Sequence, residues 1–334
     1  MASHSRLIAV LLFCVSLLGC AQPGGFVEHW GLYKQRFVSP EGRVLDSGNR
    51  GISHSEGQGW GMLFAEAAGD RQAFERIWQW TSATLLRSDV ALFAWRYDPA
   101  AANPVADPNN ASDGDLLIAW ALQRASERWQ APGYAAQSQA IRRAIDERLI
   151  RQQAGYTILL PGLVGFERED GTVVNLSYWV LPAIQHFARL EPDAGWQRLL
   201  TDAPRLLAAA RFGPHDLPPD WLVLPSHGAP QPAQGWPPRF GFDAVRVPLY
   251  FHWGGADAAL LEPIRRYWAG SGEPMPAWVD LRDGSVADFP ASLGVEAIQA
   301  VLDGRELPPA AIVQDDYYAA SLYLLSWLAR SSPR

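Results

Sequence analysis

The stretch richest in functional signals is residues 55–62, Ser55-Glu56-Gly57-Gln58-Gly59-Trp60-Gly61-Met62. One acidic side chain stands here before three glycines at alternate positions. Glycine lets a backbone come close to a ligand, and a tryptophan ring offers an apolar face to a sugar. A carboxyl beside such a surface loses hydration and holds its proton nearer neutral pH, as a general acid must. The alternative is a glutamate that complements the helix dipole in a first turn.

Two more acidic residues stand at loop-to-helix junctions beside glycine or aromatic residues. Asp113 lies in Ala111-Ser112-Asp113-Gly114-Asp115, and Asp243 follows Phe240-Gly241-Phe242. Aspartates at such junctions are commonly helix caps. Together with Glu56, in a chain with 15 tryptophans, they suggest carboxylates gathered around a groove at one end of a helical barrel.

Composition excludes several classes of function. The net charge of −7 and the absence of a basic run argue against nucleic acid as a partner. The seven histidines are scattered and none is spaced as a zinc pair, so we expect no metal and no cofactor. The glycines of residues 57–61 do not follow a strand of a βαβ unit, so they are not a dinucleotide fingerprint. At 48% hydrophobic and 19% charged residues, the chain has enough apolar residues for a large core.

The N-terminal segment has the features of an export signal. Arg6 precedes an apolar run, residues 7–18, that is too short to span a bilayer comfortably. Leu17-Leu18-Gly19-Cys20 resembles the lipobox of bacterial lipoproteins. We therefore expect a lipoprotein-type signal peptide at 1–19, a lipid anchor on Cys20, a linker at 20–28 and one catalytic domain at 29–330. The protein would be exported to the periplasm and held at the outer membrane by lipid alone, with ordinary cleavage and secretion as the alternative.

The rest of the chain shows the apolar periodicity of helices that arrive in pairs. A Pro-rich segment, 212–239, reads as an ordered surface crossing, and residues 156–160 and 172–174 are expected to pair as a small β-ribbon. Asp70 is expected to cap the helix that contains Phe74 and Leu85. The other predicted helices are 29–37, one through 64–68, 112–129, 134–152, 177–190, 196–211, 243–253, 256–269, 292–302 and 317–328. The fold class expected is all-α.

The acidic stretches resemble glycoside hydrolase family 8. Ser55-Glu56-Gly57-Gln58 with the following aromatic and Gly61 is similar to its acid motif, and residues 111–129 are similar to its signature helix apart from Gln123. Asp243-Ala244-Val245-Arg246 resembles the third block, and Asn175-Leu176-Ser177-Tyr178 a fourth element with its proline replaced. The resemblance implies an (α/α)6 barrel whose long loops form a substrate groove, and hydrolysis with inversion.

The resemblance also implies roles for single residues. Glu56 would be the proton donor and Asp243 the general base. Asp113 would bind the sugar and stabilise the transition state, or be the nucleophile that some accounts describe. Arg246 would keep Asp243 ionised, unless it makes only a surface salt bridge. Further candidates for contact with the substrate, each with a place in the core as the alternative, are Tyr178, Trp60, Trp95 and Tyr317.

Within that family, the compact layout most resembles the bacterial endo-β-1,4-glucanases that accompany cellulose synthesis. This implies internal cleavage of β-1,4-glucan, with the cellulose synthesis and export machinery as a candidate partner. Xylan, chitosan and mixed-linkage glucan are alternative substrates. Two other classes stay open: a glycan-binding or assembly lipoprotein without activity, and another α/α-barrel enzyme such as a polysaccharide lyase.

Overall fold

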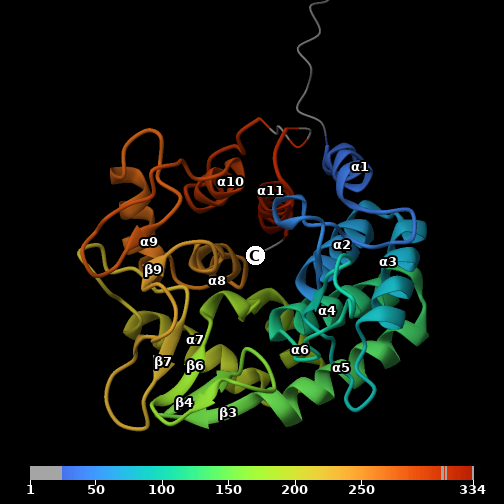
Figure 1. Cartoon of the computed structure of the whole chain (residues 1–334), viewed down its shortest axis with the longest axis horizontal. Helices are drawn as coiled ribbons and strands as arrows, with labels where there is room; N and C mark the ends of the chain where they lie inside the picture. Colours follow the sequence, from blue (N-terminus) through green and yellow to red (C-terminus); the bar gives the residue numbers. More distant parts are fainter. Residues whose placement is uncertain (1–24, 310–311, 313, 333–334) are drawn as a thin grey trace, which may run out of the picture.

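The structure is a computed structural model that describes residues 25–309, 312 and 314–332 (Figure 1). The predicted signal peptide and Cys20 lie outside these residues. The first helix begins at Phe26, so the predicted linker at 20–28 extends three or more residues too far and the folded domain starts earlier than residue 29. No helix among the described residues is long and apolar enough to cross a membrane.

Eleven α-helices are present in the described residues. Six of them contact one another in turn and close a ring: α2, α4, α6, α8, α10 and α11. Five others pack outside that ring, so the helices from α1 to α10 alternate between an outer and an inner layer, and α11 completes the inner one (Figure 1). The architecture is the expected (α/α)6 barrel. The bounds are α1 Phe26–Phe37, α2 Ser55–Ala68, α3 Arg71–Thr84, α4 Ser112–Trp129, α5 Pro132–Leu149, α6 Leu181–Leu190, α7 Trp196–Ala209, α8 Val247–Trp253, α9 Ala258–Gly270, α10 Leu293–Leu302 and α11 Tyr317–Ser331.

Local signals explain the join between α2 and α3. Gly69 ends α2 with φ 74°, a conformation that glycine adopts without strain. Asp70 then caps α3 by accepting a hydrogen bond from the backbone N–H of Ala73 at 3.1 Å, as the sequence predicts. The other carboxyl oxygen of Asp70 accepts bonds from Trp30 and Lys34 of α1, at 3.0 and 2.5 Å. One aspartate therefore ties three helices together.

The three alternate glycines lie inside α2 and serve helix packing rather than a ligand. A Cβ on Gly57 would collide with the hydroxyl of Tyr317, and one on Gly59 would lie 2.5 Å from Cβ of Leu117. A Cβ on Gly61 would lie 2.8 Å from Val44. Each glycine thus admits a different neighbour to the surface of α2. The prediction that these glycines let the backbone approach a ligand is therefore wrong, because protein side chains fill the space beside them.

Strands are short and lie between the helices. Two-residue pairs join β1 (Ser53–His54) to β2 (Arg96–Tyr97) and β9 (Arg239–Phe240) to β10 (Val279–Asp280). A hairpin joins β3 (Ile150–Gln153) to β4 (Tyr156–Leu159). The largest sheet is antiparallel, in the order β5 (Glu167–Arg168), β6 (Gly171–Val174), β7 (Leu222–Leu224) and β8 (Gln231–Pro232). The last two strands come from the Pro-rich segment, which is ordered as expected.

The predicted ribbon between residues 156–160 and 172–174 is wrong. Both segments form strands, but β4 pairs with β3 and β6 pairs with β5 and β7. The reason is local, because Ala154 and Gly155 both have positive φ, 49° and 80°. Two such residues make the tight turn that folds β4 directly back onto β3. The same hairpin ends α5 at Leu149, three residues before the predicted end.

Three single-turn 3-10 helices complete the path toward the acidic residues: η1 Ser47–Asn49, η2 Leu176–Tyr178 and η3 Ala244–Arg246. The two that matter for the site are η2, which follows β6, and η3, which leads into α8. One continuous apolar core fills the interior, and a small second cluster of Val173, Val223 and Ala233 lies under the β6–β7 sheet.

Candidate active site

The three acidic residues singled out from the sequence come together at one point. Glu56 lies in the first turn of α2, Asp113 in the first turn of α4, and Asp243 directly before η3. Gly114 allows the first two helices to meet, because a Cβ there would lie 2.7 Å from the backbone nitrogen of Glu56. In Figure 1, α2 and α4 lie side by side, and α8 lies across the barrel interior from them.

Arg246 is the centre of this acidic cluster. Its guanidinium is 3% exposed and reaches all three carboxyl groups. Nη1 forms an ion pair with Oε1 of Glu56 and lies 3.7 Å from Oδ2 of Asp113. Nη2 lies 2.7 Å from Oδ1 of Asp243. Two roles were predicted for Arg246, and the surface salt bridge is wrong. The side chain is buried, and its partners are the three residues of the acidic cluster.

Burial shifts the proton affinity of two of these carboxyls. It raises the pKa of Asp113 to about 7, although backbone N–H groups partly oppose the shift. Burial also raises the pKa of Asp243 well above its usual range, and the carboxylates of Asp220 and Asp113 raise it further. The Arg246 guanidinium at 2.7 Å favours the ionised form of Asp243. The cluster therefore holds two carboxyl groups with raised proton affinity, of which Asp113 titrates near neutral pH, beside a permanent cation.

Residues 175–178, which include η2, are a further segment that contacts the acidic cluster, besides α2, α4 and the turn before η3. Asn175 accepts hydrogen bonds from the backbone N–H and the hydroxyl of Ser177 at 3.0 and 2.7 Å. That hydroxyl in turn accepts a bond from Nη2 of Arg246 at 2.9 Å. The ring of Tyr178 lies 6.0 Å from the guanidinium carbon. Burial, with Asp113 and Asp243 nearby, raises the pKa of Tyr178 far above its usual range, so the phenol stays protonated.

Trp95 lies at the edge of the cluster and is half-buried. Its ring stacks on His54 with centroids 6.1 Å apart, and its Nε1 donates to Asp107 at 2.8 Å. The backbone N–H of Ser55 donates to the carbonyl of Trp95 at 3.0 Å. This ring is therefore fixed against the start of α2 and keeps part of its surface open, as a sugar-stacking residue requires.

Trp60 and Tyr317 require a correction, because their rings are 0% and 3% exposed. Nε1 of Trp60 donates to the hydroxyl of Tyr250 at 3.2 Å. The ring of Tyr317 packs 6.1 Å from those of Phe37 and Trp60. Both belong to a buried group of aromatic rings next to Arg246, and neither presents a face to a sugar. The alternative that the sequence left open, a place in the core, is the one observed.

Two residues at the site were missed by sequence reasoning. Asp220 is 5% exposed and accepts backbone hydrogen bonds from the turn that carries Asp243. Nothing in its Pro-rich surroundings marks it. Phe242 stands directly before Asp243 and is 45% exposed, while the hydroxyl of Tyr318 donates to its carbonyl oxygen. Phe242 served in the sequence only to mark Asp243, and its ring was not considered as a contact for the substrate.

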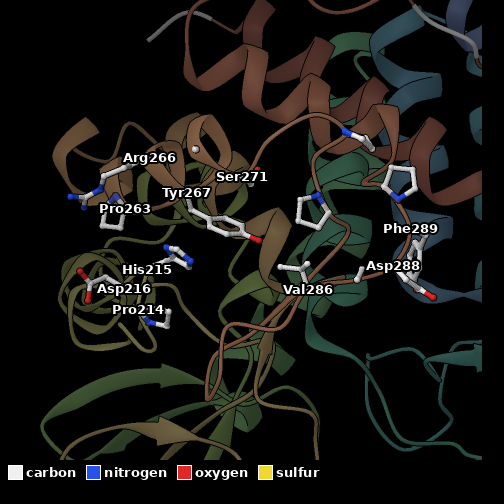
Figure 2. A pocket seen from close by; sticks show the side chains of 15 residues that line it. Pro214, His215, Asp216, Pro263, Arg266, Tyr267, Ser271, Val286, Asp288 and Phe289 are labelled. Carbon is white, nitrogen blue, oxygen red and sulfur yellow. The ribbon is translucent and has the colours of Figure 1, made fainter.

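A cavity of about 540 Å³ lies elsewhere, between α9 and residues 214–216 and 286–290 (Figure 2). His215 and Tyr267 stand together on its wall, with ring centroids 4.9 Å apart. No member of the acidic cluster lines this cavity. Within the described part of the chain, no group of three or more histidine, cysteine or acidic side chains is placed to hold a metal ion.

The chain is similar to known proteins in both sequence and fold. The sequence matches the family model "Glycosyl hydrolases family 8" over residues 3–332. It is 41% identical over 314 residues to a probable endoglucanase from Novacetimonas hansenii, covering 92% of each chain. An endoglucanase from Cellulomonas uda is 42% identical over 280 residues, 83% of this chain and 78% of that one. The solved endo-β-1,4-glucanase CMCax from Acetobacter xylinum superimposes with a TM-score of 0.88 at 41% identity, over 93% of this chain and 99% of that one.

Proposed function

The chain belongs to glycosyl hydrolases family 8, with endoglucanases among its relatives, and from this premise we propose that it cleaves internal bonds of β-1,4-glucan with inversion at the anomeric carbon. Glu56 is the proton donor and Asp243 the general base. The observation that supports this assignment best is that both carboxyls contact opposite nitrogens of the single Arg246 guanidinium.

The reaction needs one protonated and one ionised carboxyl on either side of the bond that breaks. Glu56 gives its proton to the glycosidic oxygen as the bond to the sugar lengthens. Asp243 takes a proton from the water that attacks the opposite face of the ring. In inverting enzymes the two carboxyls lie roughly 6.5–9.5 Å apart, which leaves room for that water. Glu56 and Asp243 come from different elements, α2 and the turn before η3.

Asp113 binds the sugar at the point of cleavage in this proposal. Its pKa of about 7 lets it offer a proton to a sugar hydroxyl as well as accept one. Inversion is a single displacement and needs no nucleophile from the protein. Trp95 and Phe242 offer the open aromatic faces beside the cluster, and Tyr178 the neutral hydroxyl.

The test uses soluble protein that starts after Cys20, with carboxymethyl-cellulose as substrate. We expect viscosity to fall much faster than reducing ends appear, because internal cuts shorten chains early. NMR of the first product should show the inverted anomer. Glu56→Gln and Asp243→Asn should each abolish both signals, whereas Glu147→Gln, which removes only an exposed carboxylate paired with Arg143, should not.

Each other outcome has a distinct meaning. Retention of the anomeric configuration would indicate a nucleophile and point to Asp113. Faster cleavage of xylan, chitosan or mixed-linkage glucan would mean that this polysaccharide, and not β-1,4-glucan, is the preferred substrate. Products that absorb in the near ultraviolet would indicate a lyase. No cleavage by folded protein would favour the glycan-binding alternative.

We also propose that the protein is exported and held at the outer membrane by lipid on Cys20, near the machinery that makes and exports cellulose. The support is the sequence Leu17-Leu18-Gly19-Cys20 behind an apolar run. Labelled palmitate should enter the full chain and not the Cys20→Ser variant, and only the former should sediment with membranes. Crosslinking in cellulose-producing cells would test the partner.

A further inference from the structure

Asp220 is a buried carboxylate whose hydrogen bonds go to the turn that carries the general base and to Arg239, just before that turn. Its Oδ1 accepts three backbone hydrogen bonds, from Gly241 at 3.0 Å, Asp243 at 3.1 Å and Ala244 at 2.8 Å. Its Oδ2 accepts a bond from Nε of Arg239 at 3.1 Å. One side chain therefore satisfies the open N–H groups at the start of η3, where no cap from a neighbouring residue is present.

The turn fits closely around this carboxylate. A Cβ on Gly241 would lie 3.0 Å from Oδ2 of Asp220 and 2.9 Å from Nε of Arg239. Any larger residue at position 241 would have to push one of these two groups aside. Glycine is therefore required for the chain to wrap Asp220 tightly and bring Asp243 to Arg246.

Asp220 is itself fixed by the residue that follows it. The Trp221 ring is sandwiched between two others, with Phe166 at 5.9 Å on an interplanar angle of 1° and Trp236 at 4.8 Å on 18°. The edge of Trp221 also meets Tyr178 at a centroid distance of 5.8 Å. Because the chain then enters β7, the position of Asp220 is set by the sheet and not by the helices of the barrel.

The charges around the base come from several elements. Asp243 faces Asp113 from α4, Arg246 from η3, Tyr178 from η2, Tyr318 from α11, and Asp220 with its partner Arg239. The negative charge of Asp220 raises the pKa of Asp243, as does that of Asp113. Asp220 thus acts on the base in two ways, through the backbone that it holds and through its charge.

We propose that Asp220 is a positioning residue that holds the general base Asp243 against Arg246, an inference that rests on the proposed function. Asp220 touches no reacting atom. It acts through the peptide N–H of the base and of its two neighbours in the turn. In this arrangement the Pro-rich segment contributes to the site through Asp220. The close contact between Asp220 and Gly241 connects that segment to the turn that carries Asp243.

The test compares Asp220→Asn with Asp216→Asn, which changes an exposed aspartate in the same segment away from the acidic cluster. Asparagine keeps one oxygen for the three N–H donors but removes the charge. For Asp220→Asn we expect kcat to fall about 10-fold with KM nearly unchanged. The acid limb of the kcat/KM profile should move to lower pH by about half a unit or more, because Asp243 loses a neighbouring negative charge. Asp216→Asn should have the same kcat, the same KM and the same acid limb of the kcat/KM profile as the wild type.

Gly241→Ala separates position from charge. It displaces the carboxylate without removing it, so kcat should fall by up to about 100-fold, as misplacement of a catalytic group by about 1 Å can cause. The acid limb should move less than in Asp220→Asn. Melting temperature, measured for every variant, shows whether the protein remains folded at the assay temperature.

Two results would overturn the inference while the proposed function stands. One is an Asp220→Asn protein that is folded and has the kcat and pH profile of the wild type, with Asp243→Asn inactive. The other is an Asp220→Ala protein that melts earlier but has full kcat at a temperature where it is folded, because Asp220 would then stabilise the fold only. Full activity in Asp243→Asn would instead refute the proposed function, and the role of Asp220 with it.

Discussion

The two halves of the proposed site, an acid half with Glu56 and Asp113 and a base half with Asp243, are built by different means. Glu56 and Asp113 sit on two inner helices of the barrel, α2 and α4, which approach closely because Gly59 and Gly114 present no side chain. Asp243 sits on a turn that is held by Asp220, 23 residues earlier in the chain, and by a small sheet. The first half depends on helix packing, and the second on a single buried carboxylate.

This difference determines how each half should respond to change. Helix packing distributes its contacts over many side chains, so a small change there strains the core and lowers stability. A turn held by three backbone hydrogen bonds to one residue can shift while the core remains intact. We therefore expect variants of the acid half to lose stability more readily, and variants of the base half to lose activity while they stay folded.

The largest effect should separate the two halves by their chemistry. Glu56→Gln and Asp243→Asn should each lower kcat on glucan about 1,000-fold, within the range for general acid and base groups. A cellobioside with a strongly acidic phenol as leaving group needs no proton, so Glu56→Gln should recover most of its activity on it and Asp243→Asn should not. Steady-state kinetics on both substrates measure this. Equal losses on both would contradict the assigned roles.

Arg246 joins the two halves, and its removal should affect both. Arg246→Ala leaves Glu56, Asp113 and Asp243 without their buried cation, which should lower the free energy of unfolding by about 3–5 kcal/mol at neutral pH. The loss should shrink as pH falls and the carboxyls take up protons. Denaturant unfolding measures it. Arg265→Ala, which breaks a more exposed pairing with Glu262 and Asp303, should cost less than about 1 kcal/mol. An equal cost for both would mean that Arg246 is not a buried partner.

The acid half should carry a pH dependence of stability through His54. Burial, with Arg96 and Arg246 nearby, lowers the pKa of His54 to about 4. The unfolded chain takes up a proton near pH 6.5, whereas the folded chain does so only near 4. Stability is therefore full above pH 6.5 and falls as pH drops toward 4, by about 3 kcal/mol in all. Relative to His54→Gln, the wild type should lose this much between pH 7 and 4. Parallel curves for the two proteins would disprove it.

The smallest effect tests the packing of α2 itself. Gly59→Ala places a Cβ 2.5 Å from Leu117 and 3.1 Å from the backbone of Ile118, and such overpacking should cost about 1–3 kcal/mol. Gly31→Ala in α1 is the matched control, since nothing lies within 4 Å of its added carbon. There the better helix propensity of alanine should stabilise by about 0.5–1 kcal/mol. Thermal and denaturant unfolding of both variants measure the contrast, and a stabilising Gly59→Ala would contradict the close approach.

Local patterns in the sequence were enough to predict most helices, and the acid motif was recognised by its resemblance to that of glycoside hydrolase family 8. Signals that depend on distant partners were not available. Asp220 acts on residues 21 to 24 positions later, and no periodicity marks such a contact. The strand segment 156–160 was given the wrong partner because the turn at Ala154 and Gly155 was overlooked. Trp60 and Tyr317 show that the type of an aromatic residue does not reveal which side of a helix it occupies.

The three-ring stack of Phe166, Trp221 and Trp236 also gives the base half an optical property of its own. Two indole rings with centroids 4.8 Å apart and nearly parallel planes couple their electronic transitions, and the coupling ends when the segments next to β7 and β8 that carry them separate. The near-ultraviolet circular dichroism should therefore contain a component that reports on this small sheet alone. Its loss on warming, ahead of the helical signal, would reveal the base half opening while the barrel is still closed.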